Sequence, residues 1–435
     1  MKQPISIFWF RRDLRLNDNA GLYHALKGNT PVLCLFIFDP EILDKLEDKD
    51  DARVTFIYQT IQGLNSELAT HNSSLLVKYA KPYHAWDEIL NEYNVQSVYT
   101  NHDYEPYALE RDSEMKKLFN KKGISFNTYK DQVIFEMDEV IKDDGKPYTV
   151  FTPYKRKWNG KLNAFYLKSY PTTKYLKNLV GIKPLPIPTL KDMSFVKSKT
   201  SFPPKEYKNV IDNYAGKRDY PAVKGTSHIG LHLRFGTVSI RQLASDANQA
   251  PEKTWLNELI WRDFYAMILY HFPQMATHAF KPDYDRIKWR NNETEFKAWC
   301  EGKTGYPLVD AGMRELNATG YMHNRVRMVV ASFLSKHLLI DWRWGEHYFA
   351  RLLLDYEMAS NVGGWQWAVG SGNDAAPYFR VFNPELQLKR FDPKLEYIKK
   401  WVPEYADFST YPKPIVDHVF ARDRCLKAFK AALSK

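Results

Sequence analysis

The sequence predicts an α/β domain followed by an all-α domain. We expect an open, parallel, Rossmann-like α/β domain at residues 1–130, a connector at 131–204 and an all-helical domain at 205–435. Short apolar segments alternate with helix-spaced segments in the first part, which is typical of a parallel sheet covered by helices. Helical spacing dominates the last part, and 435 residues exceed the size at which a single core stops growing.

The elements of the first domain follow one another in order. Strands are expected at Ile5–Phe10, Val32–Phe38, Leu75–Tyr79, Ser97–Thr100 and Ile124–Tyr129. Helices are expected at Asn19–Lys27, Ala52–Thr70, Ala85–Tyr93 and Leu109–Lys122. Neither GxGxxG nor a Walker loop is present, so this domain is nucleotide-binding in topology at most.

The connector differs in pattern from the helical domain. Residues 131–204 are rich in Pro and Lys and lack sustained periodicity, as a long linker would be. Amphipathic helices are then expected at Thr254–His271, Gly305–Thr319, Met322–Leu339 and Trp344–Leu354.

Composition narrows the class of function. A net charge of +11 suits a polyanionic partner such as nucleic acid, without deciding for it. Eight of the twelve tryptophans lie between positions 255 and 367, although each buried indole N–H needs a partner. The clustering favours a ring-binding or electron-carrying role, and a Trp-rich helical core is the alternative. HExxH and GxSxG are absent, so metalloprotease and serine-hydrolase functions have no support.

We expect a cytoplasmic protein without a metal centre. The cysteines are Cys34, Cys300 and Cys425. They are far apart and form no CxxC, which predicts a reducing compartment. The apolar run at residues 5–10 is too short for a signal peptide or a membrane span. His228 and His232 have no third ligand at suitable spacing, so we interpret them as ordinary helix histidines.

The stretch Leu354–Pro384 concentrates chemistry-bearing residues. It holds two carboxylates, Asp355 and Glu357, and the amide of Asn361. It is too Gly-rich to predict one helix or strand, and a turn at residues 363–364 would let the backbone approach something flat. A packed loop with buried tryptophans and the wall of a ring-binding pocket both fit these residues.

Three more segments add to this picture. The sequence GTSHIG (225–230) resembles a helix start whose hydroxyls and free N–H groups would face an anion. WLNELIWRDFY (255–265) places a carboxylate, a guanidinium and aromatic rings within two turns. Arg327 lies among valines, and Asp355 is a candidate partner. Together they suggest an aromatic, cationic cavity lined by several helices.

Several motifs occur in one order along the chain. They are RRDLRLNDN (11–19), GTSHIG, WLNELIWRDFY, TGYMHNRVRM (319–328), DWRWGEHYF (341–349) and DYEMASNVGGWQWAVGSGNDAAPYFRVFNP (355–384). In these motifs the chain resembles the photolyase and cryptochrome family over nearly its whole length. It is most similar to bacterial class I cyclobutane pyrimidine dimer photolyases.

The resemblance implies that the helical domain binds FAD. The implied FAD-binding residues are Tyr214, Thr226, Ser227, His228, Ile229, Gly230, Trp255, Glu258, Arg262, Asn324, Arg327, Asp355, Glu357 and Asn361. Thr226 and Ser227 would contact the phosphates. Arg327 and Asp355 would form the ion pair beside the isoalloxazine, and Asn361 would face flavin N5.

The resemblance also implies catalytic and DNA-binding residues. The catalytic set is Glu258, Asn361, Trp289, Trp342 and Trp365, in which the tryptophans pass electrons to photoexcited oxidised FAD. The substrate and DNA set is Arg218, Trp261, Asn324, Arg325, Met328, Trp367 and Arg380. Trp261 and Trp367 would stack on a flipped-out dimer, and Glu258 would hydrogen-bond the pyrimidine. The arginines would meet phosphates.

Four positions depart from the family pattern. Gly230 stands where Ser is usual, and Glu357 stands where Asp is usual. Tyr107 and Ala108 replace the Asn-Glu pair of folate-binding relatives. A second, antenna chromophore is therefore possible but unidentified, with deazaflavin, flavin or none open.

The function that the resemblance implies is light-dependent repair of cyclobutane pyrimidine dimers in DNA, by electron transfer from photoexcited FADH⁻. Asn324 and Met328 stand where six-four photolyases carry a His pair, so six-four repair is less favoured. A cryptochrome-type blue-light photoreceptor is the main alternative. The expected partner is DNA containing pyrimidine dimers, and we expect a monomer that binds no membrane.

Overall fold

The computed structural model describes residues 2–407 and 409–434. The chain forms two compact units, each built from separated segments. The first unit contains residues 1–136, 161–205 and 229–249, and the second contains 137–160, 206–228 and 250–435. The domain boundaries expected at residues 130 and 204 stay a prediction, because compact packing does not establish independent folding.

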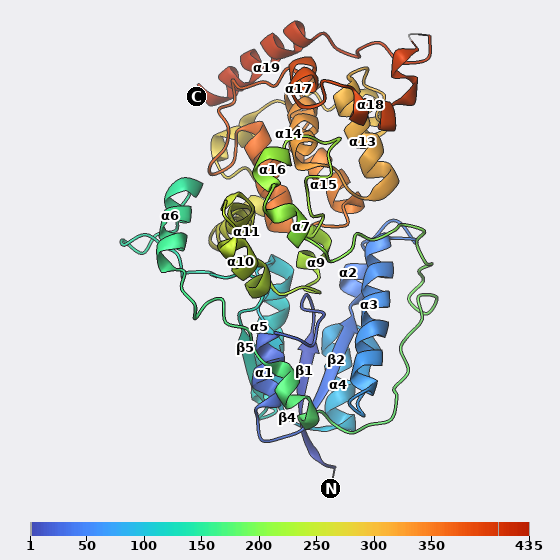
Figure 1. Ribbon diagram of the computed structural model, residues 1–435, viewed down its shortest axis with the longest axis vertical. Coiled ribbons are helices and arrows are strands. Elements are labelled where there is room, and N and C mark those ends of the chain that lie inside the picture. The colour runs from blue at the N-terminus through green and yellow to red at the C-terminus, as the bar shows by residue number, and fades with distance from the viewer. Residues whose placement is uncertain (1, 408, 435) are drawn as a thin grey trace. The chain divides into compact units, whose positions relative to one another are not determined.

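The first unit contains a five-stranded parallel sheet in the order β3-β2-β1-β4-β5 (Figure 1). Its strands are β1 (Pro4–Phe10), β2 (Val32–Phe38), β3 (Leu75–Tyr79), β4 (Asn94–Asn101) and β5 (Ser125–Tyr129). Its helices are α1 (Ala20–Leu26), α2 (Pro40–Leu43), α3 (Ala52–Ala69), α4 (Pro82–Glu92), α5 (Pro106–Lys121), η1 (Thr172–Asn178), α9 (Gly230–Arg234) and α10 (Ile240–Gln249). The predicted α/β fold class is confirmed.

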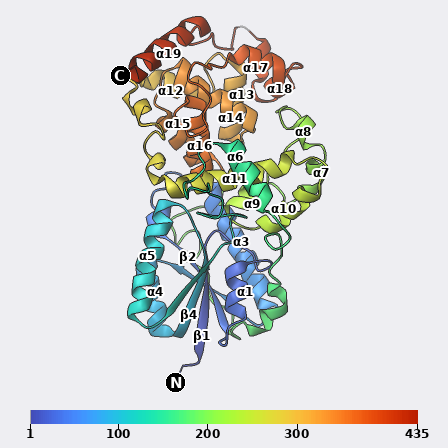
Figure 2. The same cartoon turned by 90° about the vertical axis from the view of Figure 1, so that its left-hand side faces the viewer.

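The two faces of the sheet are covered by different helices. Ile5, Ile7 and Trp9 of β1 pack with alternate residues of β2 in one apolar core. Trp86 of α4 and Phe119 of α5 complete this core. Figure 2 shows α4 and α5 on one side of the sheet and α1 on the other. Because both of their faces are buried, β1 and β2 are almost entirely apolar, which is why the sequence predicts them well.

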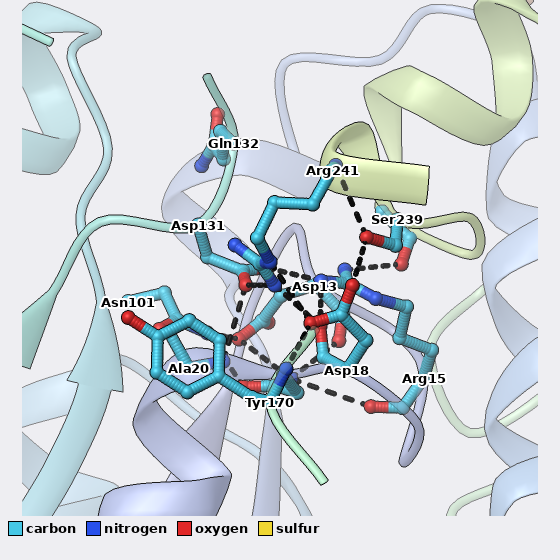
Figure 3. Close-up of polar contacts among 12 residues, drawn as sticks. Asp13, Arg15, Asp18, Ala20, Asn101, Asp131, Gln132, Tyr170, Ser239 and Arg241 are labelled. Carbon is cyan, nitrogen blue, oxygen red and sulfur yellow. Dashed lines mark hydrogen bonds and ion pairs between the residues drawn. The ribbon is translucent and has the colours of Figure 1, made fainter. Parts of the chain in front are cut away.

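A buried ion-pair network joins distant segments of the first unit (Figure 3). Asp131 accepts hydrogen bonds of 2.7 Å from both Arg15 and Arg241. Asp18 accepts one of 2.8 Å from Arg241 and another from the Ser239 hydroxyl. Burial opposes the charge of Asp131, but the two arginines outweigh it and hold the pKa of Asp131 below its ordinary value. Segment 229–249 is thus tied to the α/β sheet region.

The second unit is helical. Before residue 300 it contains α6 (Phe151–Lys161, whose last residue belongs to the first unit), α7 (Lys208–Ile211), α8 (Tyr214–Lys217), α11 (Thr254–His271), η2 (Pro273–Ala276), η3 (Pro282–Arg286) and α12 (Glu293–Cys300). Beyond it lie α13 (Pro307–Thr319), α14 (Asn324–Ser332), the π-helix η4 (Phe333–His337), α15 (Trp342–Leu352), α16 (Met358–Val369), α17 (Pro384–Phe391), α18 (Glu396–Trp401), η5 (Pro403–Ala406) and α19 (His418–Leu433). The predicted helical region is confirmed.

Two expectations about local structure are wrong. The stretch 354–384 contains a regular helix, α16, and no turn interrupts it at Gly363 and Gly364. The connector contains α6, whose Phe151, Tyr154 and Trp158 are buried at helical spacing. Tertiary contacts stabilise both helices against weak local propensity. For α6, the indole N–H of Trp158 donates to a carboxylate oxygen of α11, 2.9 Å away.

Candidate functional site

Helix α16 packs against α11, α14 and α15 in the second unit. Glycines permit two of these contacts. A Cβ on Gly363 would lie 2.3 Å from the ring of Tyr265 in α11, and one on Gly345 in α15 would lie 2.1 Å from Trp365. Gly364 behaves differently, because a Cβ there would meet no atom within 4 Å. Helix α16 therefore has packed faces and one open face.

Two arginine–carboxylate pairs flank the start of α16. Arg327 of α14 donates to both oxygens of Asp355, at 2.9 and 3.1 Å, as the sequence predicts. Arg262 of α11 donates to Glu357 at 2.8 Å, and the hydroxyl of Ser360 also donates to that carboxylate at 3.2 Å. Burial opposes the charge of Arg327, yet Asp355 keeps the pKa of Arg327 above its ordinary value. The longer arm of Glu357 thus reaches an arginine.

The amide of Asn361 is held in one orientation. Its Nδ2 donates to the Oε1 atom of Glu346 at 2.9 Å and to the backbone carbonyl of Glu346 at 3.2 Å. Burial raises the pKa of Glu346, which is 7% exposed. No described residue donates to the Oδ1 atom of Asn361. Glu346 therefore leaves Asn361 with a free acceptor.

Glu258 and Trp261, on α11, already have partners. Arg218 donates to Glu258 and lies 5.4 Å above the ring of Tyr214. Burial raises the pKa of Glu258, and Arg218 works against that shift. The Trp261 indole is stacked on Phe151, with ring centroids 3.6 Å apart. One face of Trp261 is therefore covered.

The tryptophans are not all in ring contact. Trp365 is buried and meets the edge of Trp299 at 6.2 Å. Trp342 is buried, and Trp289 is half-buried beside a phenylalanine of α19. Within the described residues, no ring contact joins Trp342 to Trp365 or to Trp289. Trp367 is half-buried on α16.

The segment preceding α9 approaches the loop between α13 and α14. The Thr226 hydroxyl lies 3.3 Å from that of Tyr321, and the ring of His228 stacks on Tyr321 at 4.0 Å. His228 has a φ of 52°, so it precedes the helix, and only His232 of the pair lies within α9. Ser227 is half-buried. The helix that GTSHIG was expected to start is α9, which is short and begins at residue 230.

The remaining predicted residues differ in exposure. Trp255 is buried and stacks on Tyr207 at 5.6 Å, whereas Asn324, the first residue of α14, is exposed. Met328 is half-buried, with its sulfur 3.7 Å from Arg325. Ile229 and Gly230 lie at the start of α9, in the first unit.

The three predicted phosphate-binding arginines are not equivalent. Arg218 is paired with Glu258, and Arg325 donates to Asp219 at 2.6 Å. Arg380 is exposed, and no carboxylate of the described residues lies within ion-pairing distance of it. Arg380 is therefore the one of the three that is free to meet an anion.

Sequence reasoning missed several residues of the site. Glu346 lies in the quoted motif DWRWGEHYF but carried no predicted role. His323 is buried, its Nδ1 accepts from the Arg325 N–H at 3.1 Å, and its Nε2 has no partner among the described residues. Trp299 shows no signal beyond the tryptophan clustering. Each of these roles depends on contacts between distant helices.

Comparison with known proteins agrees with this architecture. The family model described as "DNA photolyase" matches residues 6–174, and "FAD binding domain of DNA photolyase" matches residues 255–410. The deoxyribodipyrimidine photo-lyases of Synechococcus and Escherichia coli are both 36% identical. The first alignment covers 99% of this chain and 96% of the relative, and the second covers 98% of each. The chain belongs to the DNA photolyase family.

Solved photolyase structures share the fold. A bacterial class III photolyase from Agrobacterium tumefaciens has a TM-score of 0.89 at 31% identity and covers 100% of this chain and 99% of its own. An archaeal photolyase from Sulfolobus tokodaii, described with two FAD molecules, has a TM-score of 0.83 at 33% identity, with 98% and 99% covered. These matches confirm the photolyase fold.

The residues around α16 fit the FAD that the family model implies. The Asn361 Oδ1 atom is an acceptor without a partner, and the open face at Gly364 leaves room beside the helix. The buried Nε2 of His323 is a donor without a partner, because its Nδ1 accepts a hydrogen bond. Among the described residues, no cluster of three or more potential ligands could hold a metal ion. No described helix is long and apolar enough to cross a membrane.

Proposed function

We propose that this photolyase repairs cyclobutane pyrimidine dimers in DNA under blue light. Near full-length similarity to several deoxyribodipyrimidine photo-lyases supports the reaction class. The structural observation that carries the proposal is Asn361, whose amide is fixed by Glu346 beside the Arg327–Asp355 pair, with one acceptor left over. Such an acceptor is suited to a ring N–H.

The helical unit would hold FAD through charged and polar groups. Arg327, Asp355, Arg262 and Glu357 would lie beside the ring system, and Asn361 would accept a hydrogen bond from flavin N5–H. The phosphate end would be held by Thr226 and Ser227, with Tyr214, His228, Trp255 and Asn324 completing the set within this unit. Bound in reduced form, FAD would supply on excitation the electron that opens the dimer and would accept it back afterwards.

The chain's own residues would bind and orient the dimer. Trp367 and Trp261 would stack on the pyrimidines, and Phe151 fixes the plane of the Trp261 ring. Glu258, in its protonated form, would donate a hydrogen bond to a pyrimidine carbonyl. Asn324 and Met328 would line the same region. Damage weakens base stacking, so extrusion costs less at a dimer than elsewhere.

The electron path to oxidised FAD would begin at the buried Trp365. We infer that Trp342 and the half-buried Trp289 continue it towards the surface. The edge contact of Trp299 with Trp365 adds a second indole next to the first donor.

A repair assay tests the proposed function. Protein with chemically reduced flavin is mixed with an oligonucleotide carrying a single cyclobutane thymine dimer, and intact thymines are quantified. We expect repair in blue light, none in the dark and none of a six-four photoproduct. Absence of repair in blue light, with reduced flavin present, would contradict the enzyme function and favour a photoreceptor.

We also propose that the protein works as a monomer in the cytoplasm. A single site with all its predicted residues on one chain supports the monomer. Light scattering during gel filtration tests it, and a dimer at micromolar concentration would contradict it. Whether a second chromophore binds stays a prediction, which an absorption spectrum of the purified protein checks.

A further inference from the structure

Lys336 is a fully buried lysine without a carboxylate partner. It lies in the π-helix η4 and is 0% exposed. No carboxylate among residues 2–407 and 409–434 lies within ion-pairing distance of it. Burying an ammonium group without a counterion costs free energy. π-Helical turns are rare in proteins, and those that occur are often found at functional sites. The residue therefore needs an explanation beyond packing.

The acceptor of Lys336 is a backbone carbonyl in the segment that carries Arg380. Its Nζ donates to the Arg380 carbonyl at 2.9 Å. The Arg380 N–H in turn donates to the carbonyl of Pro377 at 2.9 Å. Both backbone groups of Arg380 are thus held, while its side chain is exposed and lies 5.5 Å from the ring of Phe382. The backbone of Arg380 is therefore held in place, while its side chain is exposed to solvent.

Helix α19 holds η4 from the other side. The His337 Nε2 lies 2.9 Å from the Nδ1 of His418, and Arg424 donates to the His337 carbonyl. Cys425 of α19 is buried near Lys336. The π-helix is therefore anchored to α19 while Lys336 reaches towards the Arg380 segment.

We propose that Lys336 is a positioning residue for DNA binding, which fixes the Arg380 backbone so that the Arg380 guanidinium is presented to a DNA phosphate. The inference rests on the proposed function, because it needs DNA as the ligand.

The charge of Lys336 makes the inference sensitive to pH. Burial, and then the charge of Arg380, lowers the pKa of Lys336 to about 8. Burial lowers the pKa of His337 to about 3 and raises that of Cys425 to about 11, so both stay neutral near pH 8. Burial also lowers the pKa of His418 and that of Arg424, and the Arg380 guanidinium acts on Lys336 as a nearby positive charge. Lys336 is therefore the group facing this segment that titrates near pH 8.

Binding of a labelled dimer-containing oligonucleotide, followed by fluorescence anisotropy, tests the inference. We expect Lys336→Met and Arg380→Ala each to weaken binding and to reduce the slope of log K against log salt by about 1. The double variant should bind no more weakly than Arg380→Ala, since Lys336 acts through Arg380. Lys297→Met removes an exposed lysine, 77% accessible, and should keep wild-type affinity.

A pH profile separates positioning from simple destabilisation. The charged ammonium holds the Arg380 carbonyl more strongly than the neutral amine does, so wild-type affinity should fall as pH rises between about 7 and 9, and Lys336→Met should show no such fall. If Lys336→Met does not fold, the wild-type profile decides, and a flat one overturns the inference. A Lys336→Met variant that binds DNA as tightly as the wild type would also overturn it. So would a double variant whose loss of affinity equals the sum of the losses in the two single variants. A wild-type protein that binds no DNA would instead remove the proposed function, and the inference with it.

Discussion

Single side chains in the helical unit are defined by the partners that hold them. The family resemblance identifies Glu258 and Asn361 from the sequence, but it does not give their hydrogen bonds. Arg218 lies 40 positions before Glu258, and Glu346 lies 15 positions before Asn361. No local pattern encodes such pairs, because they form only when the helices pack. The Arg327–Asp355 pair was predicted, whereas the hydrogen-bond partners of Glu258 and Asn361 were not.

The Arg218–Glu258 pair should shift the pH dependence of repair. Burial raises the pKa of Glu258 and Arg218 lowers it, so Arg218→Gln should raise it further. A protonated Glu258 can donate to a pyrimidine carbonyl, and a higher pKa keeps it protonated to higher pH. At saturating DNA, the alkaline decline of single-turnover repair should therefore move to higher pH in Arg218→Gln.

A matched control for this change is Arg325→Gln. It also removes a predicted phosphate contact, but its partner is Asp219 rather than Glu258. Its repair profile should keep the wild-type midpoint. A profile of Arg218→Gln that coincides with that of Arg325→Gln would show that the ion pair does not control Glu258.

At the scale of elements, prediction succeeded where burial leaves a regular pattern. The strands β2 and β3 were predicted to the residue. β2 is an uninterrupted apolar run because it is buried along its whole length, and the edge strand β3 begins with three buried apolar residues. Helix α16 was missed because its two glycines weaken helical propensity. One of them, Gly363, is required by the close approach of α11, which only the folded chain reveals.

The two glycines of α16 should respond oppositely to substitution. A Cβ at position 363 would lie 2.3 Å from the Tyr265 ring, so Gly363→Ala should destabilise the protein. Overpacking of this kind typically costs about 1–3 kcal/mol. A Cβ at position 364 would meet nothing within 4 Å, so Gly364→Ala should stabilise the FAD-free protein. The gain expected from helix propensity is about 1 kcal/mol.

Urea unfolding of the FAD-free variants measures both effects. Adjacent positions in one helix are the best control for each other, since backbone propensity favours Ala at both. Equal stabilisation by the two substitutions would contradict the close contact with α11. A loss of FAD affinity in Gly364→Ala alone would indicate that the open face lies against the cofactor.

At the scale of the whole molecule, the two compact units are interleaved along the chain. Residues 229–249 belong to the first unit, although the helical spacing after residue 205 predicts a continuous helical domain. Their membership is set by long-range contacts. Arg241 and Ser239 bind Asp18, and the backbone carbonyl of Gly236 accepts from Arg15 at 2.9 Å (Figure 3). Hydrophobic periodicity alone cannot reveal that residues 229–249 pack with the first unit.

Two N-terminal fragments of the chain should differ in stability. Residues 1–204 end at the boundary expected from sequence, whereas residues 1–249 contain every segment of the first unit. The shorter fragment lacks Arg241 and leaves Asp18 and Asp131 with fewer partners in a buried site. Breaking a buried pair in this way costs about 3–5 kcal/mol. The longer fragment should therefore unfold at clearly higher urea concentration, as followed by circular dichroism.

The variant Arg241→Met in fragment 1–249 isolates the cause. It keeps the chain length and most of the side-chain volume but removes the two ion pairs with Asp18 and Asp131. It should lose most of the advantage of the longer fragment. The low pKa of Asp131 gives a second test. A carboxyl group whose pKa is lowered by folding stabilises the folded state at pH values above the ordinary pKa of that group. That stability should disappear as pH falls through the lowered pKa in fragment 1–249, and less so in the variant. Equal urea midpoints for fragments 1–204 and 1–249 would show instead that the division at residue 204 is a true folding boundary.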